Sequence, residues 1–155
     1  MPSYFWLASP RLKKPIEDDV PYTTQALQED LCRLRNAWED CQANRGRDAI
    51  YGYLRTVFDL VVWWAAENCA IERARKALRL HNVSPSDRDE PFAAIIRCTA
   101  DPAKVDKRTR SKWSRVLRYV LEYKSHSEPL DQFIKRKGGI NKCASRFARL
   151  LGARR

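Results

Sequence analysis

The side chains best suited to bind another molecule lie near the end of the chain, in a predicted helix that follows Gly138-Gly139. Spacings of one, four, five and eight residues bring five polar side chains near one another on one helix face. They are Asn141, Lys142, Ser145, Arg146 and Arg149. Asn and Arg form bidentate hydrogen bonds with the edges of adenine and guanine, while Lys and Ser bind phosphate oxygens. The cluster therefore predicts contact with nucleic acid.

A glycine turn between two short helices is predicted to position this cluster. The first helix begins near Ser127-Glu128-Pro129 and continues through Leu130, Phe133 and Ile134. Gly138-Gly139 ends it, because glycine adopts the left-handed conformation found at helix ends without a steric cost. The second helix has an apolar side made of Ile140, Cys143, Ala144, Phe147 and Leu151. Its basic outer side has the form needed to enter a DNA major groove.

This arrangement resembles the first part of helix-turn-helix DNA-binding domains, in which a Gly turn precedes a helix with small residues, such as Cys143 and Ala144, at the helix crossing. The resemblance extends from Leu130 to Phe147 and implies a duplex DNA partner. In many such domains a further recognition helix follows, whereas here only residues 152–155 remain. An ordinary helical corner with a solvated cationic face is the alternative interpretation.

A second basic surface is predicted on the helix that Asp106 caps and that continues to about Lys124. Its apolar positions recur at three- and four-residue spacing, and most of its remaining side chains are cationic. We expect phosphate contacts from both predicted basic segments. The residues concerned are Lys107, Arg108, Arg110, Lys112, Arg115, Lys135, Arg136 and Lys137.

The charge of the whole chain favours the same class of partner. Residues 102–155 contain sixteen Lys and Arg against four Asp and Glu, which accounts for the entire formal net charge of +11. Residues 1–101 contain fourteen basic and fifteen acidic residues. One-sided charge on a folded segment indicates a polyanionic partner. We expect DNA rather than RNA, because few aromatic side chains in the basic segment are placed to stack on bases. An adaptor, inhibitor or assembly subunit that docks on an acidic protein is the alternative.

The expected fold class is all-α, with a single compact domain of about five to six helices. Four prolines predict an extended arm over residues 1–22, which carries the apolar cluster Tyr4-Phe5-Trp6-Leu7. The helical domain spans residues 23–155, with a neutral half at 23–101 and a basic helix-turn-helix-like module at 102–155. Whether the chain dimerises, and whether the arm swaps between subunits, stays open.

Helical periodicity predicts the elements of the neutral half. One helix is expected from Thr24 to Gln42, and a long second helix from Asp48 towards Leu80. The segment from Leu60 to Ala66 is apolar on all sides, which predicts a central helix whose later polar turns emerge into solvent. A short helix starts at Pro91, and Asp101-Pro102 has the pattern of another helix start.

Other functional classes have little support in the sequence. The chain lacks the G-x-S-x-G, P-loop and H-E-x-x-H motifs, so we expect a non-enzymatic protein without a cofactor. Five cysteines without a C-x-x-C pair predict buried free thiols rather than disulfides or a zinc site. No apolar stretch is long enough to span a bilayer and no signal peptide is evident, so we expect a cytoplasmic protein.

Overall fold

The computed structural model describes residues 21–44, 46–84 and 90–153. Within these ranges the chain is all-α, as predicted, and has no strand; it contains seven helices, whereas about five to six were expected. The helices are α2 (Thr24–Ala43), α3 (Ala49–Ala66), α4 (Ala70–Leu80), α5 (Pro91–Thr99), α6 (Lys107–Tyr123), α7 (Leu130–Arg136) and α8 (Ile140–Ala153).

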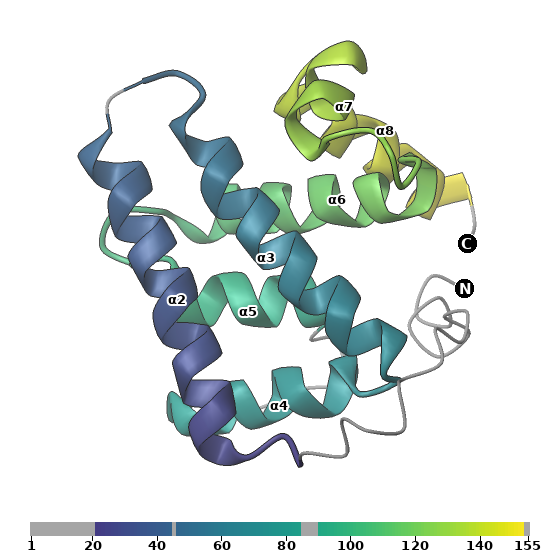
Figure 1. Cartoon of the computed structure of the whole chain (residues 1–155). Helices are drawn as coiled ribbons and strands as arrows, with labels where there is room; N and C mark the ends of the chain where they lie inside the picture. The colour runs from purple at the N-terminus through teal and green to yellow at the C-terminus, as the bar shows by residue number, and fades with distance from the viewer. Residues whose placement is uncertain (1–20, 45, 85–89, 154–155) are drawn as a thin grey trace.

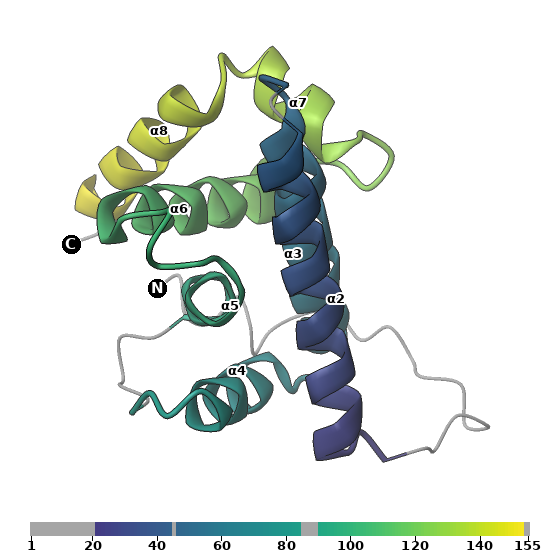
Figure 2. The same cartoon turned by 90° about the vertical axis from the view of Figure 1, so that its left-hand side faces the viewer.

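The helices are arranged as a crossed stack. Helices α2 and α3 form an antiparallel pair, and α4, α5 and α6 lie one above another across its inner side (Figures 1 and 2). Helices α7 and α8 extend the stack beyond α6. The predicted neutral half and basic module share one hydrophobic core, because Trp38 and Tyr53 pack edge-on against Trp113 of α6.

The predicted second helix is in fact two helices, and the expectation of one helix from Asp48 towards Leu80 is wrong. Asn68 adopts a left-handed backbone conformation with φ of 59° directly after α3. The amide of Asn68 donates to the carbonyl of Ala65 at 2.9 Å, and the amide of Cys69 donates to that of Trp64 at 3.0 Å. These bonds form a Schellman motif, which satisfies the last carbonyls of α3 and lets the chain reverse.

The segment after this break does not emerge into solvent. Helix α4 packs against α5 and buries one side of small and apolar residues, namely Ala70, Ala74, Ala77 and Leu78. Its polar residues are therefore only the outer side of an amphipathic helix.

The apolar middle of α3 is likewise not enclosed on all sides. Val61 and Trp64 are fully buried, but Trp63 is 47% exposed. Helix α3 therefore has an outer face that no described helix covers.

The connection before α6 corrects a further prediction, since Asp101-Pro102 starts a turn and not a helix. The Asp101 carboxylate accepts a hydrogen bond from the amide of Ala103 at 2.9 Å. The backbone carbonyl of Asp101 accepts from the amides of Lys104 and Val105. Helix α6 begins at Lys107, as predicted from Asp106, whose carboxylate accepts from the amide of Thr109 at 2.8 Å. The local turn at Asp101 uses the same kind of side-chain bond that caps a helix.

Some predictions lie outside the described residues, among them the arm up to Val20 and the turn at residues 85–87. The cysteines are free, but only Cys143 is buried, and Cys32 is exposed. In the described ranges, no helix is both long and apolar enough to cross a membrane.

Candidate nucleic-acid interface

The glycine turn between α7 and α8 has the geometry that the sequence predicts. Gly138 and Gly139 both adopt φ of +103°, a conformation that strains any residue with a side chain. The amide of Gly139 donates to the carbonyl of Ile134 at 2.8 Å, and that of Gly138 donates to Lys135 at 3.1 Å. This Schellman motif ends α7 and directs the chain into α8 within three residues.

Helix α8 is fixed by its apolar side. Cys143, Ala144 and Phe147 are buried against α6 and α7. Burying a side chain such as Phe147 contributes about 1.5–3 kcal/mol relative to leaving it exposed. The guanidinium of Arg118 on α6 lies 4.7 Å from the centre of the Phe147 ring, so a cation covers the seam between the two helices.

Four of the five polar residues predicted on α8 are exposed. Asn141, Lys142, Ser145 and Arg149 point into solvent, and none of them forms an ion pair within the described part of the chain. The stem of Lys142 lies across the turn, because a Cβ built on Gly138 would meet its Cδ at 2.5 Å.

Arg146, the fifth predicted residue, is engaged inside the protein. It is half-buried and donates a hydrogen bond of 2.6 Å to the carbonyl of Lys137. Lys137 itself lies with its ammonium 5.9 Å from the Phe133 ring centre. The bond from Arg146 joins α8 to the end of α7, whereas the Lys137 side chain contacts α7 alone.

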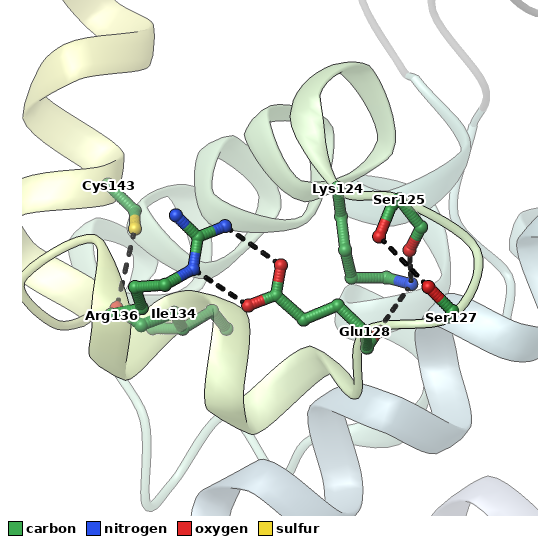
Figure 3. A network of polar contacts seen from close by, with 7 residues as sticks. All are labelled: Lys124, Ser125, Ser127, Glu128, Ile134, Arg136 and Cys143. Atoms are coloured by element: carbon green, nitrogen blue, oxygen red, sulfur yellow. Dashed lines mark hydrogen bonds and ion pairs between the residues drawn. The ribbon is translucent and has the colours of Figure 1, made fainter.

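The two cations of α7 are paired with carboxylates. Lys135 donates to Asp48, before α3, at 2.8 Å and lies over the ring of Tyr51. Arg136 donates through Nε and Nη2 to the two carboxylate oxygens of Glu128, both at 2.8 Å (Figure 3). The hydrogen bond that Lys135 donates to Asp48 raises the pKa of Lys135, and the bonds that Arg136 donates to Glu128 lower the pKa of Glu128.

Figure 3 shows how this pairing fixes the connection between α6 and α7. The ammonium of Lys124 donates to the carbonyls of Ser125 and Glu128, at 2.8 and 2.9 Å. Cys143 of α8 approaches the carbonyl of Ile134 from the other side. Helix α7 thus serves mainly to position α8, and its cations have partners within the chain.

The basic residues of α6 differ in their surroundings. Lys107 and Arg108 are exposed and form no ion pair among the described residues, whereas Arg110 and Lys112 are half-buried. Arg115 donates to Ser111 at 2.8 Å and stays on its own helix. Arg118 was not among the predicted contacts, although its position three residues after Arg115 places it on the same side of the helix.

We call nine polar side chains of these two contacting helices the α6–α8 surface, which leaves out the half-buried Arg110 and the internally bonded Arg146. It consists of Lys107, Arg108, Lys112, Arg115 and Arg118 of α6, with Asn141, Lys142, Ser145 and Arg149 of α8. Helices α6 and α8 together contain nine Lys and Arg and a single carboxylate, that of Glu122. Such an excess produces a positive field that attracts polyanions.

Comparison of the chain with protein-family models, with curated proteins and with solved structures finds no match in any of the three. Within the described ranges, no three His, Cys, Asp or Glu side chains are grouped so that they could hold a metal ion. The functional argument therefore depends on the geometry and charge of the α6–α8 surface.

Proposed function

We propose that this protein binds duplex DNA through the α6–α8 surface, without catalysing a reaction. The observation that carries the proposal is the ratio of nine cations to one carboxylate on two helices in direct contact. Nonspecific affinity for DNA comes from neutralised phosphates and the counterions that they release. A surface of this charge has the electrostatic basis for such binding.

Helix α8 is the element proposed to contact base edges. Helix α6 packs against both α7 and α8, and the latter two are joined by the tight glycine turn. In helix-turn-helix proteins the N-terminal residues of the second helix of this pair contact bases. Asn141 and Lys142 lie in the first turn of α8, and Ser145 and Arg149 follow on its exposed side.

Phosphate contacts are assigned to the start of α6. Lys107 and Arg108 are exposed, and Lys112 follows one turn later. Lys135, Arg136 and Arg146 are bonded within the chain, which supports a positioning role for these three residues. The proposed interface therefore contains fewer residues than the sequence predicted.

The test is a titration of fluorescently labelled duplex DNA, followed by anisotropy at low and at physiological salt. We expect the affinity for DNA to fall steeply as the salt concentration rises. The double variant Lys142→Glu and Arg149→Glu should abolish binding. The matched control is Lys76→Glu with Arg79→Glu on α4, which changes the net charge equally at the opposite end of the stack (Figure 2). Circular dichroism of each variant establishes that it is folded.

Two results would contradict the proposal. Wild-type protein that binds no duplex at low salt would remove DNA as the partner and favour an acidic protein. Equal loss of affinity in the α8 and α4 variants would show that net charge acts without a defined surface.

A further inference from the structure

Residues of α2 and α3 line a groove of about 570 Å³. We call it the α2–α3 groove; it is lined by Asp30, Arg33, Leu34, Arg55, Thr56, Asp59, Leu60 and Trp63. Trp63, 47% exposed, is the most exposed of the large apolar side chains in the described ranges. A tryptophan on the rim of a groove is a common anchor of protein interfaces.

Charge limits where two copies of this chain can approach each other. The α6–α8 surface repels its own copy, because both would present the same excess of cations. Helices α2 and α3 contain five acidic and three basic residues, which is close to neutral. Contact between two copies is therefore electrostatically permitted on the α2–α3 face.

Arg55 and Asp59 give the groove one exposed charge of each sign, so the same patch on a second copy can pair with it. Asp30 accepts hydrogen bonds from Tyr22 and Arg33. Arg55 and Asp59 form no ion pair within 4.0 Å among the described residues, although the charges of Arg55 and Lys124 act on Asp59 within the same chain. They lie four residues apart on one side of α3. When two α3 helices run antiparallel about a two-fold axis at the level of residue 57, Arg55 of each copy faces Asp59 of the other.

Gly52 supplies an independent observation on the same side of α3. It is exposed within the helix, where glycine is about 1 kcal/mol less favourable than alanine. A Cβ built on Gly52 would meet no atom within 4 Å, so no described part of the chain requires a glycine there. Along α3, Trp63 lies ~9 Å beyond residue 57, the level of the two-fold axis, and Gly52 lies ~7.5 Å before it. The two-fold axis therefore brings the indole of one copy opposite Gly52 of the other copy.

We propose that two copies of this chain form a symmetric dimer through the α2–α3 groove, with α3 packed antiparallel against α3 and Trp63 seated over Gly52 of the second copy. Reciprocal contacts between Arg55 and Asp59 fix the register. The pairing is independent of the proposed DNA binding and leaves α8 exposed on both copies.

Size-exclusion chromatography with light scattering tests the dimer directly. We expect a mass of twice 18.1 kDa for the wild type. Asp59→Arg and Arg55→Asp each place like charges opposite one another and should give monomers, whereas the double exchange restores the dimer. Asp40→Arg, at an exposed site of α2 outside the groove, makes the same change in charge and should remain dimeric.

Gly52→Leu tests the contact without changing charge. Gly52 is exposed and a Cβ there would meet no atom within 4 Å, so circular dichroism should be unchanged while the dimer is lost. A wild type that stays monomeric at high protein concentration overturns the proposal. A dimer that Asp59→Arg and Gly52→Leu leave intact also overturns it, and a double exchange that stays monomeric rules out the reciprocal register.

These results are separable from the test of DNA binding. A monomeric Asp59→Arg protein that still binds DNA with steep salt dependence shows that the DNA surface is independent of the dimer. A dimer that binds no DNA would support this inference while contradicting the proposed function.

Discussion

Arg146 of α8 donates a hydrogen bond of 2.6 Å to the backbone carbonyl of Lys137, the residue that follows the last turn of α7. Carbonyls at the end of a helix lack partners within the helix, and a guanidinium satisfies one of them here. The same bond ties the start of the glycine turn to the middle of α8. A residue that appears from sequence to face DNA is thus one that positions the α7–α8 corner.

Arg146→Ala should therefore destabilise the fold more than Arg149→Ala does. Removing a charged partner from a half-buried carbonyl costs about 1–3 kcal/mol, whereas a change at an exposed site away from such features stays within about 0.5 kcal/mol. Urea denaturation of the two variants measures the difference. Equal free energies of unfolding would show that the Arg146 bond does not contribute to stability.

Gly138→Ala should also destabilise the corner. At φ of +103° a side chain costs about 1–2 kcal/mol of backbone strain, and its Cβ would displace Lys142, whose Cδ would lie 2.5 Å away. Gly152→Ala is the control, because Gly152 is helical and has open space around it, so alanine there should stabilise by about 0.5–1 kcal/mol. Thermal denaturation should move the two melting temperatures in opposite directions.

Sequence patterns identify the helix boundaries at Gly138-Gly139 and Asp106 and the end of α4 before Asn82, but they miss the end of α3 before Asn68. Gly138-Gly139 and Asp106 are correctly predicted boundaries. Asn68 is not, because apolar residues precede it and a helical charge pattern follows, so periodicity alone continues through the break. Asparagine tolerates the left-handed conformation, but less regularly than glycine, and its presence is a weak signal.

The ion-pair partners of the basic residues cannot be predicted from the sequence pattern. Lys135 and Asp48 are separated by 87 residues and meet only because α7 lies beside the start of α3. Helical spacing shows which side of a helix a cation occupies, and it predicts the exposed positions of Lys142 and Arg149. It does not show whether a carboxylate from another element neutralises that cation.

The pair of Glu128 and Arg136 predicts a dependence of stability on pH. The hydrogen bonds from Arg136 lower the pKa of Glu128, so the pair stabilises the fold fully above the ordinary pKa of about 4.3. This contribution is lost as the pH falls through the lowered pKa. Glu128→Gln should melt below the wild type at neutral pH, and the difference should disappear once the pH falls below the lowered pKa of Glu128.

Thermal scans at several pH values measure this difference, and Arg136→Gln is the matched variant. Arg136→Gln removes the cation of the same pair, and its melting temperature should approach that of the wild type over the same pH range. A constant difference between wild type and Glu128→Gln would mean that the pair does not act through the ionised carboxylate.

The salt dependence of DNA affinity should distinguish Lys142 from Lys135. Each phosphate neutralised by a cation contributes about 0.9 to the slope of log affinity against log salt concentration. Lys142 is exposed at the start of α8, so Lys142→Ala should reduce the slope by about that amount. Lys135 is paired with Asp48, so Lys135→Ala should leave the slope unchanged. Anisotropy titrations at four or more salt concentrations give both slopes. An equal reduction of the slope in the two variants would place α7 within the DNA contact and contradict the positioning role proposed for Lys135.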